Sequence, residues 1–476
     1  MRILLIQGND KMKKLMLFGC VFWIFNSCSL LGENKTDPES GLAYRYQNKT
    51  SFEKIKFETQ EFELENGLKV VVVPRRDLPI VSYFTLYKVG SRHEPVGLTG
   101  ASHFLEHLMF KGSKNYPNGK YDEILESVGG SNNAYATYDA TVYHAAFPAE
   151  QLEVMISLEA DRMNGLNFDE ASFEKEKKVI LEERKMRLEN SPEGKIYDQM
   201  LSESFKKSFY EHNVLGNIED IEKVTREQIF AFYKNFYVPN NATIFIVGDV
   251  SFSHVKSLIK SYYDDLPRKS LIKEEKIFQA NSLSYQSLDI RGISPDPMIM
   301  LSFPGAKDGT REALILDLMT ILIGDGKSSF FQELYVETDN PKLSELYAGN
   351  IKLKDSGVLF INAQMLPKIG IVWLEKNMRK QLRNICNETI NERNLQKAKN
   401  HYLINLMKTL STNDGIADYL VSKEMATDDY TQYKYELQTI ANITVQEAQE
   451  ICSNYINPEK AFFISLWNRN PIRRVR

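Results

Sequence analysis

The sequence contains a short run of residues suited to binding a metal ion, His103-Phe-Leu-Glu-His107. In a helix, with about 100° per residue, the two histidines and Glu106 share one side, and Phe104 and Leu105 take the other. Histidines four residues apart can share one ion, and Zn²⁺ binds neutral imidazole readily. A glutamate beside them that is not a ligand can accept the proton of a water molecule activated by the ion. The run therefore indicates a hydrolytic zinc site; the alternative is an ordinary amphipathic helix whose histidines bind nothing.

A third metal ligand must come from another element, and a charged helix expected from Asp169 to about Leu188 offers six glutamates. They are Glu170, Glu174, Glu176, Glu182, Glu183 and Glu189. Glu176 and Glu183 are seven residues apart and share a helix face, and the apolar residues between them indicate partial burial. A buried carboxylate needs a partner, which a metal would supply. The residues alone leave the choice open, and a solvated helix rich in ion pairs is the alternative.

The N-terminus has the pattern of an export signal. A lysine-rich start at residues 11–14 precedes the apolar run Leu15–Phe25, which is too short to span a bilayer. A small residue then precedes Cys28, as in a lipoprotein leader. We expect residues 1–28 to be the leader, Cys28 to carry a lipid, and the protein to be anchored in the periplasm or cell envelope. An ordinary cleaved signal and an uncleaved anchor are the alternatives.

Composition indicates a soluble globular protein with more than one domain. The chain has 476 residues, of which 43% are hydrophobic and 26% charged, and its net charge of −4 gives no sign of a nucleic-acid partner. Beyond Cys28 only Cys386 and Cys452 remain, far apart in the sequence. We therefore expect no disulfide to staple the fold and no zinc held by thiolates.

One unit of the chain recurs. A helix expected at Thr225–Tyr237 and a strand at Ala242–Val247 have counterparts 219 residues later, at Thr444–Ile456 and Ala461–Leu466, with a proline at the matching position between them. A constant offset without a gap is most simply explained by an internal duplication. We expect an α+β fold of two homologous half-domains, each a mostly antiparallel sheet covered by helices.

The expected organisation follows from these patterns. It comprises a leader at 1–28, a polar tether at 29–52, a zinc-bearing half at 53–266, a linker at 267–284 and a second half at 285–476. The first half should contain a hairpin at 62–74 turning at Asn66-Gly67, a strand at 79–89, helices at 121–128 and 149–166 and a strand pair at 133–147. In the second half we expect strands at 297–303 and 358–363 and helices at 312–323 and 395–410.

Four blocks of the sequence together resemble the pitrilysin/insulinase peptidases, family M16, which include the mitochondrial processing peptidases. The blocks are His103–Gly112, Gly129–Tyr135, Thr141–Tyr143 and Glu174–Glu183. The order H-x-x-E-H is that of the inverzincins. The family takes its third ligand from a glutamate 76 residues after the second histidine, which is the spacing from His107 to Glu183.

The resemblance implies a role for each residue of the site. His103, His107 and Glu183 would hold one Zn²⁺, Glu106 would be the general base, and Glu176 would support the site without necessarily touching the metal. It also implies that a peptide binds as an added strand along Asn133-Ala134 and that the two halves close on it like a clam. The expected activity is that of a zinc endopeptidase acting on extended or unfolded peptides.

The second half departs from the family pattern. It lacks H-x-x-E-H, and Leu359 stands where active members carry an arginine that binds the substrate carbonyl together with a tyrosine seven residues away. No arginine lies between Arg311 and Arg379. Some bacterial members are split into a zinc-bearing subunit and a similar partner, so we expect a heterodimer whose paralogous partner supplies the Arg–Tyr pair. The alternatives are a non-catalytic scaffold subunit, against which the intact motif counts, and a zinc-binding surface lipoprotein.

Overall fold

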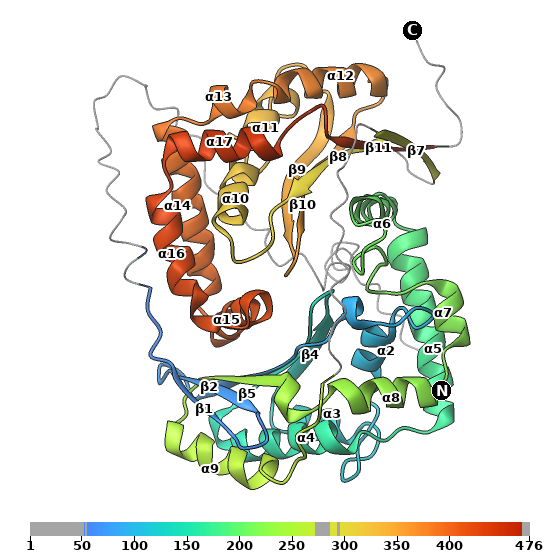
Figure 1. Ribbon diagram of the computed structural model, residues 1–476, viewed down its shortest axis with the longest axis vertical. Coiled ribbons are helices and arrows are strands. Elements are labelled where there is room, and N and C mark those ends of the chain that lie inside the picture. The colour runs from blue at the N-terminus through green and yellow to red at the C-terminus, as the bar shows by residue number, and fades with distance from the viewer. Residues whose placement is uncertain (1–51, 53–54, 272–285, 293–295, 469–476) are drawn as a thin grey trace, which may run out of the picture.

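The computed structural model describes residue 52 and residues 55–271, 286–292 and 296–468, and it consists of two halves that each contain one sheet (Figure 1). The predicted leader, the tether before Phe52 and most of the linker lie outside the described residues. Among the helices that are described, none has the length and apolar character needed to cross a bilayer.

The first sheet has the strand order β1-β2-β6-β3-β5-β4. β1 and β2 form the expected hairpin, and Gly67 at its turn has a φ of +88°, a conformation that glycine adopts without strain. β2 and β6 are parallel, whereas the remaining neighbours are antiparallel. The strands are β1 (Gln60–Glu63), β2 (Lys69–Pro74), β3 (Ile80–Tyr87), β4 (Ser131–Ala136), β5 (Thr141–Pro148) and β6 (Ala242–Gly248).

The second sheet repeats this topology with the order β7-β11-β8-β10-β9. Its one parallel pair, β7 and β11, corresponds to β2 and β6, and the antiparallel neighbours follow in the same sequence. The prediction of two homologous α+β halves is therefore confirmed. The strands are β7 (Gln286–Gly292), β8 (Met298–Gly305), β9 (Leu343–Lys352), β10 (Gly357–Met365) and β11 (Phe462–Asn468).

The recurring helix has the same length and cap in both halves. Thr225 accepts a hydrogen bond from the backbone N–H of Gln228, and Thr444 accepts one from Glu447. Such caps satisfy N–H groups that have no partner within the helix. The helices of the first half are α2 (Ala101–Leu108), α3 (Lys120–Ser127), α4 (Leu152–Gly165), α5 (Glu170–Arg184), α6 (Pro192–Ser204), α7 (Ile218–Lys223), α8 (Arg226–Phe236) and α9 (Phe252–Tyr263).

Each half places a helix on the sheet of the other. α15 of the second half packs on β3 and β6, and α6 of the first half packs on β8 and β11 (Figure 1). The buried core accordingly runs across both halves, since Phe84 and Val247 belong to the same cluster as Leu420. The second-half helices are α10 (Arg311–Ile323), α11 (Phe330–Tyr335), α12 (Ile371–Leu382), α13 (Ile385–Thr389), α14 (Glu392–Thr409), α15 (Asn413–Thr427), α16 (Tyr433–Asn442) and α17 (Val445–Tyr455).

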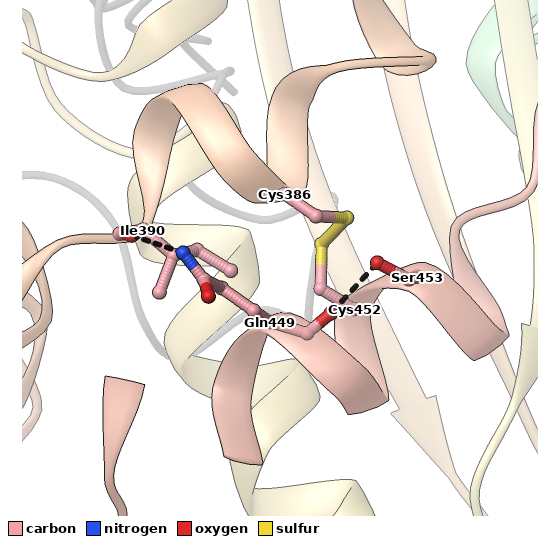
Figure 2. The surroundings of a disulfide bond; sticks show 5 residues. All are labelled: Cys386, Ile390, Gln449, Cys452 and Ser453. Atoms are coloured by element: carbon pink, nitrogen blue, oxygen red, sulfur yellow. Dashed lines mark hydrogen bonds between the residues drawn. A yellow bond between two sulfur atoms is a disulfide. The ribbon is translucent and has the colours of Figure 1, made fainter. Parts of the chain in front are cut away.

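A disulfide joins Cys386 of α13 to Cys452 of α17 (Figure 2). The expectation that nothing staples the fold is therefore wrong. The two cysteines are 66 residues apart in sequence, but α13 packs against α17 and brings their Cα atoms to 5.7 Å. Gln449 of α17 also donates a hydrogen bond to the carbonyl oxygen of Ile390, which follows α13, so polar and covalent links hold the same pair of helices.

Candidate metal centre

Helix α2 presents the two histidines because its other side is buried. Phe104, Leu105 and Leu108 are buried in the core of the first half, and Phe104 stacks on Phe173 of α5 with ring centroids 4.9 Å apart. The N-terminus of α2 is fixed by Glu94, whose carboxylate accepts hydrogen bonds from the backbone N–H groups of Gly100 and Ser102. The helix expected at this motif is confirmed, with Phe104 and Leu105 on its buried side.

Helix α5 brings its glutamates to the same place. Asp169 caps the helix by accepting a hydrogen bond from the backbone N–H of Ser172, and Phe173 and Ile180 are buried against the core. Glu176 lies on this buried face, and Glu183, two turns further on, is mostly buried. Directly after α5 the chain makes one π-helical turn, Lys185–Glu189.

Three side chains from the two helices converge. His103 Nε2 and His107 Nε2 lie 3.3 Å apart, and Glu183 Oε2 lies 3.6 Å from the first and 3.2 Å from the second. Their ligand atoms all lie within 4.8 Å of one another, and this is the only such group in the part of the chain that the structure describes. Two imidazoles and one carboxylate are a donor set of catalytic zinc sites, so these residues fit the ion.

Neighbouring side chains contact His107 and Glu183 through hydrogen bonds and ion pairs. His107 Nδ1 donates to Glu176 Oε1 at 2.8 Å, the arrangement that commonly orients a ligating histidine. Lys111 Nζ lies 2.9 Å from Glu176 Oε2, and Arg187 Nη2 lies 2.7 Å from Glu183 Oε1. The sequence analysis missed both cations. Arg187 stands four residues after Glu183, a spacing that brings helical side chains together, whereas Lys111 lies beyond the end of α2 and meets Glu176 only through tertiary packing.

The electrostatics of the group differ from residue to residue. Burial and, after it, the charge of the neighbouring His107 lower the pKa of His103 to about 3. Burial also lowers the pKa of His107, but its hydrogen bonds to Glu176 and Glu183 outweigh this effect and raise the pKa to about 9. For Glu183, burial raises the pKa, yet the hydrogen bond to His107 and nearby positive charge bring it down to about 2. Glu183 is therefore an anion at neutral pH, as a metal ligand requires.

Glu106 differs from the other acids of the site. Its Oε2 is buried and has no hydrogen-bond partner among the described residues. Burial raises its pKa to about 7, against the lowering effect of His107. A carboxylate with this pKa and a free oxygen can exchange a proton at neutral pH.

The residues expected to bind substrate lie beside this site. β4 is the last strand of the first sheet and pairs with β5 alone, and α2 packs against it. Asn133 is exposed on β4, whereas Ala134 is buried toward the core of the first half. No described strand pairs with the outer edge of β4, and within the strand the backbone N–H of Ala134 donates to Asn133 Oδ1.

The other histidines lie outside the metal group. His144 stacks on Phe84 with ring centroids 4.7 Å apart, and His212 binds the carboxylate of Glu94. Leu359 on β10 is buried in the core of the second half. The residue at this position is therefore a buried apolar side chain and not an arginine that could bind a substrate.

Comparison with known proteins agrees with the two-domain fold. Residues 72–217 match the family model described as Insulinase (Peptidase family M16), and residues 223–402 match the one described as Peptidase M16 inactive domain. Two homologous α+β halves with one His–His–Glu group define a two-domain peptidase of this kind. The first match ends at residue 217 and the second begins at residue 223, before the last strand of the first sheet, β6. The expected limits of the two halves, 53–266 and 285–476, remain predictions.

Individual relatives give the same result. The chain is 30% identical over 389 residues to zinc protease PqqE of Helicobacter pylori, covering 79% of this chain and 86% of that protein. It is 23% identical over 316 residues to a probable mitochondrial-processing peptidase subunit beta of Arabidopsis thaliana, covering 64% and 59%. The crystal structure of a protease from Helicobacter pylori superposes with a TM-score of 0.80 at 26% identity, covering 87% of this chain and all of that one. The chain belongs to peptidase family M16.

Proposed function

We propose that the protein is a zinc-dependent endopeptidase that cleaves extended or unfolded peptides. The observation that carries the proposal is the convergence of His103, His107 and Glu183 around one point, with Glu106 next to them, whose Oε2 has no hydrogen-bond partner among the described residues. The zinc protease PqqE of Helicobacter pylori, with 30% identity, supports the same activity.

The side chains suggest a division of labour. His103, His107 and Glu183 would hold the Zn²⁺, which supplies a Lewis acid that lowers the pKa of water. Glu106 accepts the proton of the attacking water on its free Oε2 and then delivers it to the amine that leaves when the peptide bond breaks. Glu176 keeps the ring of His107 in one orientation through its hydrogen bond to Nδ1.

The position of β4 at the end of the first sheet supports an extended substrate. A peptide that adds to a sheet edge makes main-chain hydrogen bonds, which a folded segment has already used. Asn133 and Ala134 lie on this strand, and α2 with Glu106 packs against it. The geometry therefore favours unfolded segments over folded proteins as substrates.

We further propose that the active form is a heterodimer with a paralogous partner that supplies an Arg–Tyr pair. The support is the lack of any arginine between Arg311 and Arg379 and the burial of Leu359. Without these donors the developing oxyanion loses stabilisation, and one missing donor costs about 3–4 kcal/mol in the barrier. The intact ligand set and the unpartnered Oε2 of Glu106 favour a catalytic role over a scaffold or a metal-storage role.

A peptidase assay tests both proposals. A quenched fluorescent peptide library is incubated with the purified chain, alone and mixed with candidate paralogous subunits, with and without a zinc chelator. We expect weak cleavage by the chain alone, a sharp increase on mixing, and loss of cleavage with the chelator. Full activity of the chain alone would contradict the heterodimer, and cleavage that survives chelation would contradict the zinc mechanism.

Export with a lipid at Cys28 is a third part of the proposal. The leader pattern supports it, and so does the disulfide between Cys386 and Cys452, because such bonds persist mainly in oxidising compartments. Mass spectrometry of the mature N-terminus tests the lipid. An unmodified Cys28, or a mature chain that begins elsewhere, would contradict the anchor.

A further inference from the structure

We propose that two cations outside the ligand set, Lys111 and Arg187, are positioning residues of the metal centre. Each binds the second oxygen of an α5 carboxylate whose first oxygen serves the site. The inference rests on the proposed function, because it takes His103, His107 and Glu183 to hold zinc.

Arg187 fixes the ligand Glu183. One oxygen of that carboxylate, Oε2, faces His107 Nε2 at 3.2 Å, and the other, Oε1, lies 2.7 Å from Arg187 Nη2. A carboxylate held at both oxygens cannot turn its plane away from the histidines. The guanidinium keeps its charge at any relevant pH, so this hold does not depend on titration of the arginine.

The backbone of Arg187 is itself held in place. Arg187 lies in the π-helical turn that follows α5, and single π-turns occur often at functional sites. The first turn of α6 passes directly over it, since a Cβ built on Gly194 would lie 1.7 Å from the Arg187 carbonyl oxygen. α6 in turn packs on the second sheet, so the second half of the molecule supports the position of Arg187.

Lys111 acts one step further from the ion, through Glu176. Glu176 Oε1 accepts the hydrogen bond from His107 Nδ1 at 2.8 Å, and Oε2 lies 2.9 Å from Lys111 Nζ. With its proton on Nδ1, the His107 ring presents the lone pair of Nε2 to the ion. Lys111 therefore helps to set both the orientation and the tautomer of His107.

The alternative is that the two pairs are ordinary surface ion pairs, which contribute little to stability. The side chains of Lys111 and Arg187 are 31% and 33% exposed, but their partners Glu176 and Glu183 are only 7% and 16% exposed. The two readings differ in what they predict. Surface pairs would affect stability slightly and metal binding not at all, whereas positioning residues affect metal binding.

The first experiment measures metal binding to the purified full chain. Zn²⁺ affinity is determined by competition with a chromophoric chelator, and the Co²⁺-substituted protein is followed by its absorption spectrum. We expect Arg187→Met and Lys111→Met each to weaken metal binding about 10- to 100-fold, the range typical for residues that support ligands, and to alter the Co²⁺ spectrum. Arg187→Lys should recover part of the loss because it restores the charge.

A matched control removes a cation from α5 that has no contact with the site. Lys178 is exposed, and no salt bridge to it occurs among the described residues, so Lys178→Met should bind metal like the parent. The unfolding free energy of each metal-free variant should stay near the parental value, which separates positioning from misfolding. A variant that lost stability and metal affinity together, in the same proportion, would overturn the inference.

A second background tests the route of action. In a Glu176→Gln chain, which keeps all three proposed ligands, Lys111→Met should cause no further loss of metal affinity, whereas Arg187→Met should still cause its full loss. Parental affinity and an unchanged Co²⁺ spectrum in both methionine variants would overturn the inference and leave the proposed function standing. A parental chain that bound no zinc would overturn the proposed function itself.

Discussion

Glu106 and His107 are neighbours in the sequence, yet their surroundings give them different chemistry. His107 has both ring nitrogens engaged, one with Glu176 and one facing Glu183, while Glu106 has a buried oxygen with no partner in the described part of the chain. The difference follows from the helix, which turns the two side chains by about 100° relative to each other. In the proposed mechanism His107 binds the metal ion and Glu106 transfers the proton.

Substitution separates these two roles. Glu106→Gln should keep zinc and lower turnover by a factor of about 10²–10⁴, because the amide is nearly isosteric but cannot accept the proton. His107→Ala should lose both zinc and turnover. Zinc content by elemental analysis and peptide cleavage are measured on the same samples. Equal loss of zinc in the two variants would show that Glu106 is not the base but a ligand or a structural residue.

For individual residues, the sequence predicted the group of His103, His107 and Glu183 but not the side chains that contact it. The histidine motif predicted the metal site, and the spacing to Glu183, read through the family resemblance, selected one glutamate of six. Lys111, Arg187 and Glu94 were not predicted. The contacts of Lys111 and Arg187 depend on which nearby acid each side chain meets, and those of Glu94 depend on how the loop before α2 folds against its first turn. Tertiary packing decides both, and residue type does not.

Elements were easier to predict where their pattern is local. The β1–β2 hairpin follows from Asn66-Gly67, and the caps of α5 and α8 follow from Asp169 and Thr225. The disulfide could not be predicted, because Cys386 and Cys452 are close only after α13 packs against α17. A pairing across 66 residues has no signal in local sequence.

The start of α2 should respond to pH through His212. His212 Nε2 lies 3.1 Å from Glu94 Oε2, and Glu94 in turn fixes the N-terminus of α2. Burial lowers the pKa of His212, but the hydrogen bond to Glu94 outweighs it, so the folded-state pKa lies above the ordinary value of 6.5. The stabilisation is therefore complete below pH 6.5 and is lost as the pH rises through the folded-state pKa.

The measurement is urea unfolding of the parent and of His212→Gln at several pH values. The variant should be less stable than the parent at acidic pH, and the difference should shrink as the pH increases above 6.5. His254→Gln, at an exposed position of α9, is the matched control and should show no such trend. A difference that stayed constant with pH would contradict this assignment for His212.

The whole molecule is held together by contacts that cross between its halves. Glu424 of α15 is completely buried and pairs with Lys69 of β2 and with Lys88, directly after β3, at 3.2 and 3.1 Å. Removing one partner from a buried pair leaves an uncompensated charge, which is costly. Together with the packing of α6 on the second sheet and of α15 on the first, these contacts fix how the two sheets face each other. The duplication was predictable from the constant offset, but the exchange of helices was not, because apolar residues do not specify which sheet they cover.

This arrangement predicts the result of cutting the chain between the halves. A protease recognition sequence placed within residues 272–284 and cleaved after folding should yield two fragments that still elute together from a sizing column. Each fragment alone would expose the sheet face that the other's helix covers, at a cost of about 25 cal/mol for each Å² of apolar surface. The two fragments eluting separately under native conditions would contradict this view of the interface.

The mutual exchange of α6 and α15 has a consequence for the inheritance of this architecture. Because each half covers part of the other half's sheet with a helix, deletion of either half would expose apolar surface of the other. Encoding the two halves as separate chains, by contrast, requires only that the two chains associate. The second half can therefore lack a metal-binding motif, provided that its fold still covers the sheet of the first half.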